Sequence, residues 1–127
     1  MARVDLSAAE VGIYSLSSKN LSPLPTYEFD VNRFRDPIGN RNLTSKCVDG
    51  RDGEVKKWIR TDPRFLPILE TILLLCEDQV RHGEKKWISF GFRDHHGKWI
   101  SRALAELVAD ELANVNYSVG VLHAATT

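Results

Sequence analysis

Apolar residues recur at helical spacing in two long segments of the chain. Residues 63–81 begin with Pro63 directly after a capping residue, and their apolar face is wide enough to predict a largely buried helix. A second helix is predicted from residue 100 to a polar break at residues 114–116, because six apolar side chains share one of its faces. A shorter helix is expected over residues 54–60. The shared apolar face of the second helix carries Ile100, Ala103, Leu104, Leu107, Val108 and Leu112.

Short apolar runs alternate with these helices and are predicted to be strands, at residues 11–15, 27–31, 86–91 and 117–122. The resulting order, β-β-α-α-β-α-β, favours an α/β fold: a small single domain with a mostly parallel sheet of about four strands and three helices. The last strand, helix and strand are expected to pair in parallel through a right-handed connection. We expect residues 1–127 to form this one domain, with flexible ends at residues 1–8 and 124–127.

Composition and charge disfavour several classes of function, but they say little more about the fold. The apolar share of 43%, the charged share of 27% and the formal net charge of zero are ordinary for a globular domain, and they disfavour a surface that grips nucleic acid as a whole. No apolar run has the length of a membrane span, and the start lacks the apolar core of a secretory signal. Cys47 and Cys76 lack zinc-ligand spacing, so we expect free thiols and a cytoplasmic protein. Neither a P-loop nor a Gly-x-Gly-x-x-Gly pattern occurs, and we expect no cofactor.

The segment 87–111 offers a candidate anion site. An apolar run ends at Gly91, a polar loop with Gly97 follows, and a helix pattern then begins. Such a loop can bind an anion, because free backbone N–H groups and the positive end of the helix dipole meet there. Ser101 is placed to bond a phosphate or to cap the helix, and Arg102 to reach the same anion or to point to solvent. An ordinary connection between strand and helix has the same pattern and remains open.

A second candidate lies where the predicted strand 27–31 ends. Asp30 is followed by Asn32 and Arg33. A carboxylate and a guanidinium at the carboxyl end of a strand are well placed to contact a ligand in an α/β sheet. Surface charge beside a loop is the alternative explanation.

Two adjacent histidines, His95 and His96, lie in the same loop as Gly97. With Asp94 they could supply a zinc or nickel site, although adjacent side chains on an extended loop point apart and a solvated loop is the plainer interpretation. Histidine suits acid–base chemistry near neutral pH, but no matching nucleophile is evident. We therefore expect neither a catalytic nor a metal site. The candidate ligand-binding residues are Asp30, Asn32, Arg33, Gly91, Arg93, His95, His96, Gly97, Lys98, Ser101 and Arg102.

Several short motifs follow one another between about residues 11 and 123. They are Phe29-Asp30-Val31-Asn32-Arg33 with Asp36-Pro37, Asp49-Gly50-Arg51-Asp52-Gly53-Glu54-Val55, Pro63, Gly97-Lys98-Trp99-Ile100-Ser101 with Arg102-Ala103-Leu104-Ala105-Glu106, and Val119-Gly120-Val121-Leu122-His123. In order and spacing the series resembles the C-terminal domain of the RNase adapter protein RapZ family. That family has Phe-Asp-Val-Arg near Asn-Pro, Thr-Gly-x-Asp-x-Glu-Val, a Pro before a long helix, Gly-Cys-Thr-Gly-Gly-x-His-Arg-Ser before Val-Ala-Leu-Ala-Glu, and Val-x-Val-x-His.

The resemblance implies a homodimer whose domain senses a phosphorylated amino sugar and binds a small RNA. Trp99 and Ile100 stand where the family has its loop His and Arg, and Phe92 stands at its loop Cys. Positive charge near the loop must therefore come from neighbouring residues. The family's N-terminal ATPase half and basic RNA-binding tail have no counterpart. A stand-alone copy of this kind suits a bacteriophage or mobile-element protein, which would act in the host cytoplasm.

We therefore expect a small α/β binding protein, rather than an enzyme, that holds a phosphorylated sugar or nucleotide at the strand–loop–helix site. The alternative is an interaction protein that has lost the pocket and binds a host protein or RNA. A hydrolase that uses His95 or His96 ranks last. The wide apolar face of residues 64–80, together with Trp58 and Trp87, further predicts a homodimer, because large exposed apolar patches mark interfaces.

Overall fold

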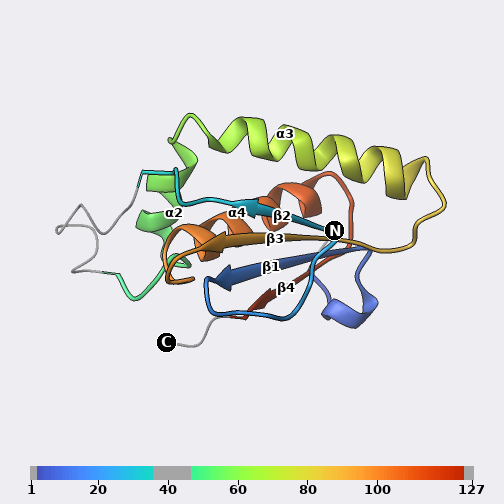
Figure 1. Cartoon of the computed structure of the whole chain (residues 1–127). Coiled ribbons are helices and arrows are strands. Elements are labelled where there is room, and N and C mark those ends of the chain that lie inside the picture. Colours follow the sequence, from blue (N-terminus) through green and yellow to red (C-terminus); the bar gives the residue numbers. More distant parts are fainter. Residues whose placement is uncertain (1–2, 36–46, 125–127) are drawn as a thin grey trace.

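The computed structural model describes residues 3–35 and 47–124 of the chain. Its centre is a sheet of four parallel strands in the order β2-β3-β1-β4 (Figure 1). The predicted α/β fold with a parallel sheet of four strands is confirmed. The strands are β1 (Val11–Ser17), β2 (Tyr27–Asp30), β3 (Ile88–Asp94) and β4 (Val119–His123).

Three α-helices accompany the sheet, as the sequence predicted. α2 spans Gly53–Arg60, α3 spans Phe65–Cys76 and α4 spans Ile100–Asn114. α3 continues into a π-helical turn, η3 (Glu77–Arg81), so that the two together span residues 65–81. The expected helix over residues 63–81 therefore begins two residues later than predicted, and Pro63 lies in the turn before it. A short 3-10 turn, η1 (Leu6–Ala8), precedes β1.

The order of the strands corrects one expectation. β3 and β4 are parallel, but they do not pair with each other, because β1 lies between them and pairs with both. Val11 of β1 is aligned with Ile88 on one side and with Val119 on the other. All seven residues of β1 are buried, so this strand takes a central place in the sheet, where both of its backbone edges are paired.

β3 is longer than its apolar run suggested. Its pairing with β1 continues through Leu16 with Arg93 and Ser17 with Asp94, so the strand ends at Asp94. Gly91 therefore lies inside the strand rather than at the start of the loop. Backbone pairing extended the strand over polar residues that the apolar pattern had assigned to the loop.

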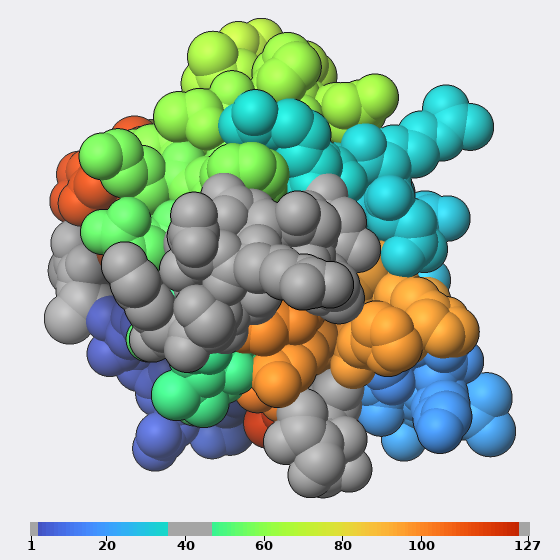
Figure 2. All heavy atoms as spheres, turned by 90° about the vertical axis from the view of Figure 1, so that its left-hand side faces the viewer, coloured from blue at the N-terminus to red at the C-terminus, as the bar shows by residue number. Residues whose placement is uncertain are grey.

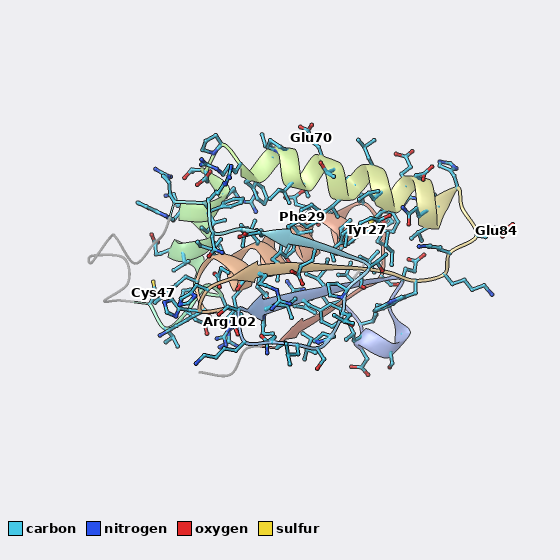
Figure 3. All side chains as sticks on the ribbon, viewed as in Figure 1. Tyr27, Phe29, Cys47, Glu70, Glu84 and Arg102 are labelled. Carbon is cyan, nitrogen blue, oxygen red and sulfur yellow. The ribbon has the colours of Figure 1, made fainter. Side chains whose placement is uncertain are left out.

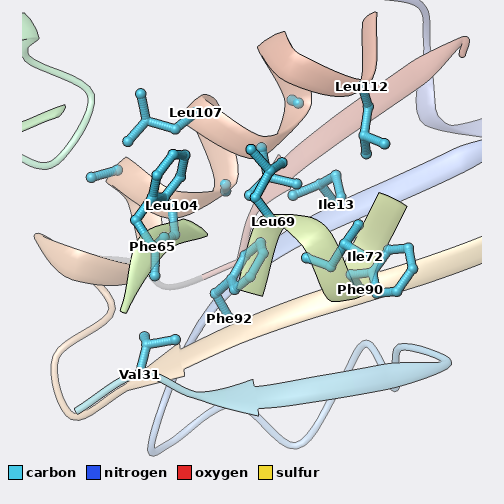
Figure 4. Close-up of a cluster of buried hydrophobic side chains, with 14 of the residues drawn as sticks. Ile13, Val31, Phe65, Leu69, Ile72, Phe90, Phe92, Leu104, Leu107 and Leu112 are labelled. Atoms are coloured by element: carbon cyan, nitrogen blue, oxygen red, sulfur yellow. The ribbon is translucent and has the colours of Figure 1, made fainter. Parts of the chain in front are cut away.

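One face of the sheet carries the main hydrophobic core. Side chains of β1 and β3, such as Ile13, Phe90 and Phe92, are fully buried and pack with residues of the helices (Figure 4). Tyr27 of β2 stacks on Phe90, and its hydroxyl accepts a hydrogen bond from Gln79 at 2.5 Å, which ties β2 to the helical layer (Figure 3). The helical side chains of the core include Phe65, Leu69, Ile72, Leu104, Leu107 and Leu112.

The opposite face is covered by chain segments without regular helices. On this face β1, β3 and β4 each have one glycine, at Gly12, Gly91 and Gly120, and other segments approach these glycines closely. A Cβ atom on Gly91 would lie 2.7 Å from Cγ of Pro25, and one on Gly12 would lie 2.3 Å from the ring of Trp87. Gly91 thus makes room for the segment between β1 and β2.

The segment before β1 also lies against the sheet. Arg3 forms an isolated bridge with Val119 of β4, and its guanidinium pairs with Glu106 and Asp110 of α4 at 2.9 Å each. The sequence predicted a flexible end here and another at residues 124–127; residues 1–2 and 125–127 lie outside the described residues. Within residues 3–35 and 47–124, no helix combines the length and apolar character that a membrane crossing requires.

We expect Gly91→Ala to lower the free energy of unfolding by about 1–3 kcal/mol, the usual cost of overpacking a filled site, because the new Cβ would meet Pro25 and Leu16. Gly53→Ala is the matched control, since nothing lies within 4 Å of a Cβ at that position. The control should be neutral or stabilise by less than ~1 kcal/mol. Urea unfolding of the three proteins checks this, and equal stabilities would contradict the packing role of Gly91.

Candidate functional site at the carboxyl ends of the strands

All four strands run the same way, so their carboxyl ends meet at one edge of the sheet, which Figure 2 shows from outside. In parallel α/β sheets this edge is where ligands bind. Hydrogen bonds join the segments that meet there. The His95 N–H donates to Oδ1 of Asn32 at 3.0 Å, and the Gly50 N–H donates to the carbonyl of Lys98 at 2.7 Å. The loop after β3 therefore contacts both the turn after β2 and the segment before α2.

The N-terminus of α4 already binds a carboxylate of the chain itself. Oδ1 of Asp94 accepts the Gly97 N–H, and Oδ2 accepts the Ser101 N–H at 3.0 Å. Gly97 has a φ of 67°, a left-handed conformation that favours glycine. Asp94 is only 5% exposed, so its side chain closes this end of the helix. The backbone N–H groups that the sequence suggested for an external anion are bound to an internal one.

Ser101 and Arg102 are buried in the first turn of α4. The Ser101 hydroxyl is fully buried and lacks a hydrogen-bond partner within residues 3–35 and 47–124. Nη1 of Arg102 donates to Oδ2 of Asp49 at 2.8 Å, and both side chains are almost fully buried (Figure 3). Arg102 thus holds the segment before α2 against α4.

Asp49 is the centre of this contact, and the sequence did not single it out as a site residue. Burial acts to raise its pKa, but hydrogen bonds from the Arg51 side chain and backbone, with a further one from Arg102, outweigh burial and lower the pKa from 3.8 to about 2. Oδ2 of Asp49 lies 2.7 Å from Nη2 of Arg51. Asp49 therefore stays ionised at neutral pH and pairs with both guanidiniums.

Arg93 is also bound within the fold. Its guanidinium forms two hydrogen bonds of 2.9 Å with the carboxylate of Glu28 on β2. It donates as well to the carbonyls of Ser17 and Asn20, the second at 2.8 Å. Hydrogen bonding to Glu28 raises the pKa of Arg93. These contacts join β3, β2 and the segment after β1. The guanidinium of Arg93, which the sequence analysis predicted to contact a ligand, is thus bound to groups of the protein itself.

Asp30 and Arg33 line a cavity of about 490 Å³ between the end of β2 and the start of α3. Oδ1 of Asp30 accepts hydrogen bonds from the backbone and side-chain nitrogens of Asn32, at 3.0 and 2.8 Å. Arg64 adds a second guanidinium to the lining, and sequence reasoning had missed it. Only the fold brings residues 30–34 next to residues 63–68, so no local pattern could have revealed the pair. The remaining lining residues are Phe34, Pro63, Pro67 and Ile68.

The two loop histidines are exposed at the same edge. The rings of His95 and His96 meet edge to face with their centroids 4.5 Å apart. Nζ of Lys98 lies over the ring of Trp99, 5.1 Å from its centroid. Across residues 3–35 and 47–124, no group of three or more His, Cys, Asp or Glu side chains is arranged to hold a metal ion.

A chain of hydrogen bonds near the end of β4 has the residue types of a catalytic triad. The hydroxyl of Ser15 lies 2.7 Å from Nδ1 of His123, and Nε2 of His123 lies 2.8 Å from Oε2 of Glu106. Ser15, which would be the nucleophile of such a triad, is fully buried, so its hydroxyl is not open to a substrate. The network ties β1, β4 and α4 together. Spacing along the chain gave no signal for it, because each residue lies on a different element.

Glu106 carries the charge of this network. The hydrogen bond from His123 lowers its pKa, burial opposes this, and the charge of Arg3 adds to the lowering, so the pKa falls from 4.5 to about 2. Since the folded protein then binds the proton more weakly than the unfolded chain, Glu106 stabilises the fold above pH 4.5. That contribution is lost as the pH falls from about 4.5 towards 2.

We expect Glu106→Gln to reduce the loss of stability on acidification between pH 4.5 and pH 2.5. By linkage the shift corresponds to roughly 3 kcal/mol at most. Glu70→Gln is the control, because Glu70 is exposed on α3 (Figure 3). Urea unfolding at several pH values measures the effect. An identical pH dependence in wild type and Glu106→Gln would show that Glu106 is not the linked group.

We expect Asp94→Ala to cost about 1–2 kcal/mol, as the loss of a helix cap does. Inorganic phosphate should raise the melting temperature of the variant more than that of wild type, because the vacated N–H groups can then bind an external oxyanion. Asp78→Ala removes an exposed carboxylate from η3 and serves as the control. Thermal unfolding with and without phosphate decides the matter, and equal shifts would contradict the internal-anion role of Asp94.

Comparison with known proteins finds similarity to part of several longer proteins that are named nucleotide-binding protein. One from Cereibacter sphaeroides is 36% identical over 99 residues, which cover 75% of this chain and 32% of that protein. One from Ruegeria pomeroyi is 31% identical over 98 residues, covering 75% and 34%. One from Novosphingobium aromaticivorans is 29% identical over 109 residues, covering 84% and 35%.

No family model matches the chain. The chain spans about a third of the length of the curated relatives it matches. It is thus similar, over most of its own length, to one segment of proteins that carry a nucleotide-binding name.

Proposed function

We propose that this domain binds a phosphorylated small molecule, a nucleotide or a phosphosugar, at the carboxyl edge of its sheet. Arg33 and Arg64 would hold the phosphate, and Asp30 would accept a hydrogen bond from the rest of the ligand. The observation that carries the proposal is the cavity of about 490 Å³ lined by these three side chains and four apolar ones. Its volume lies within the range usual for small-molecule sites.

The two guanidiniums have little internal compensation. Among the described residues, Arg33 has no acceptor within hydrogen-bond distance, and Arg64 pairs with Asp62 only at 3.5 Å. Asp62 already accepts the backbone N–H groups of Arg35 and Arg64, at 2.7 and 2.9 Å. Guanidinium groups bind phosphate through paired, charge-assisted hydrogen bonds. A phosphate between the two arginines would supply the acceptors that the fold does not.

The site proposed here differs from the strand–loop–helix site that the sequence favoured. Gly91, Arg93, Gly97, Ser101 and Arg102 take part in strand pairing, ion pairs or the first turn of α4. Their contacts support the fold and leave the cavity at the end of β2 as the better ligand site. A ligand that extends beyond this cavity would next reach other groups of the same edge, the exposed Asn32, His95 and His96 and the half-buried Lys98.

The comparisons and the resemblance support this class of ligand in different ways. The name of the relatives supports nucleotide binding in general, although it applies to proteins about three times as long. The resemblance to the RapZ C-terminal domain supports a phosphosugar. Both point to a phosphorylated small molecule, and neither supplies a reaction, so we propose a binding function and no catalysis.

One observation favours the alternative function. Asp94 fills the N-terminus of α4, which is what a domain that had lost its anion pocket would show. Such a domain would act by binding a host protein or RNA. Leu66 and Leu74 of α3 are 59% and 68% exposed and would suit self-association, in line with the expected homodimer.

We expect Arg33→Ala and Arg64→Ala each to weaken binding of a phosphorylated ligand about tenfold or more, because a hydrogen bond to a charged group contributes roughly 1.5–3 kcal/mol. Lys85→Ala removes an equal charge between η3 and β3 and should leave affinity unchanged. Calorimetry with AMP, ribose 5-phosphate and glucosamine 6-phosphate measures the effect. If none of the three binds to wild type, the alternative of a lost pocket is correct.

A further inference from the structure

The cavity between β2 and α3 has two walls of unlike chemistry. One wall comes from the start of α3, with Pro67 and Ile68, and from the turn just before it, with Pro63 and Arg64. The other wall comes from the end of β2 and the turn after it, with Asp30, Arg33 and Phe34. Each wall thus carries one guanidinium; the wall at α3 is otherwise apolar, and the wall at β2 adds a carboxylate and the ring of Phe34.

The apolar part of the lining argues for a flat, weakly hydrated group in the ligand. The cavity is lined by Phe34, which is only 4% exposed, and by the exposed Pro63 and Pro67. A hexose would bury several hydroxyls against these surfaces, and only Asp30 offers a side-chain acceptor. Burying a hydroxyl without a partner costs free energy, whereas a heteroaromatic ring gains from contact with apolar and guanidinium surfaces.

We infer that the cavity accepts a nucleoside monophosphate unit, an inference that rests on the proposed binding of a phosphorylated small molecule. The phosphate lies between Arg33 and Arg64. The base packs on Pro63, Pro67 and Ile68. This arrangement uses both guanidiniums and the apolar surface, which neither inorganic phosphate nor a sugar phosphate does.

Asp30 gives the cavity one further polar contact. Asn32 donates both of its hydrogen bonds to Oδ1 of Asp30, so Oδ2 is left to accept one from the ligand. A ribose hydroxyl or a base amino group is the donor of suitable kind. The start of α3 is not the anchor of the phosphate, because Asp62 already accepts the N–H groups of Arg64 and, through its carbonyl, of Phe65.

The same chemistry has two sources, a free nucleotide and a nucleotide within a single-stranded RNA. The net charge of zero favours the free nucleotide, since strand binding draws on a track of positive charge along the backbone. Neighbouring nucleotides should add affinity if the ligand is a single-stranded RNA, and should add none if it is a free nucleotide.

The experiment compares AMP, adenosine, ribose 5-phosphate, inorganic phosphate and a short single-stranded RNA by calorimetry with the full chain. We expect AMP to bind at least tenfold more tightly than ribose 5-phosphate and than adenosine. Arg33→Ala and Arg64→Ala should each reduce AMP affinity about tenfold. Pro67→Glu alters an exposed apolar residue and should abolish the advantage of AMP over ribose 5-phosphate, while circular dichroism shows an unchanged fold. Lys85→Ala should have no effect.

Each outcome has a separate meaning. Equal affinity for AMP and ribose 5-phosphate, with both lost in the arginine variants, would overturn the nucleoside inference and leave the proposed function intact. Absence of binding by every phosphorylated compound would overturn both. RNA that binds more tightly than AMP and loses affinity in both arginine variants and in Pro67→Glu would support the same nucleotide chemistry in a strand. RNA binding that survives those three variants would overturn the inference.

Discussion

The hydrogen bonds of the Asp94 carboxylate fix the loop and helix start at the carboxyl edge of the sheet. They bind the N–H groups of Gly97 and Ser101, so that one side chain shapes the loop after β3 and starts α4. The carbonyl of Lys98, held in that loop, in turn accepts the N–H of Gly50. A carboxylate at the positive end of a helix is favourable in itself, and burial strengthens the interaction. The N–H groups at the start of α4 are therefore already bound to a carboxylate of the protein itself. For this reason the proposed ligand site lies at the end of the neighbouring strand β2.

The parallel sheet explains why that neighbouring site exists. A parallel arrangement brings the ends of all strands to one edge, and β2, at one side of the sheet, ends beside α3. Arg33 and Arg64 are distant in sequence and reach one cavity only through this arrangement. Elsewhere on the edge, arginines are neutralised by Glu28 and Asp49. The arginines that pair with these carboxylates support the fold. Arg33 and Arg64, which have little internal compensation, are the ones proposed to bind the ligand.

The sequence predicted the helices and strands better than it predicted how they are arranged in the sheet. Apolar spacing located the three α-helices and four strands of residues 3–35 and 47–124, since burial of one face imposes that spacing, but it did not reveal the short turn η1. It misplaced the end of β3, because Arg93 and Asp94 continue the strand by backbone pairing and their polarity carries no sign of it. It paired the last two strands directly, because local order does not reveal that β1 inserts between them. Asp30 and Arg33 could be proposed from their place at the end of a strand, whereas Arg64, Asp49 and the Ser15–His123–Glu106 network depend on contacts between distant segments.

The short length of β2 has a consequence for how the cavity responds to a ligand. β2 has four residues and pairs only with β3, so its backbone has fewer hydrogen bonds to break than any inner strand. Segments of this kind open locally at a smaller free energy than the whole domain unfolds. A ligand that joins Arg33 to Arg64 would cross-link this lightly held strand to α3. Binding should therefore slow amide hydrogen exchange in β2 far more than in β1, whose exchange already requires the whole sheet to open.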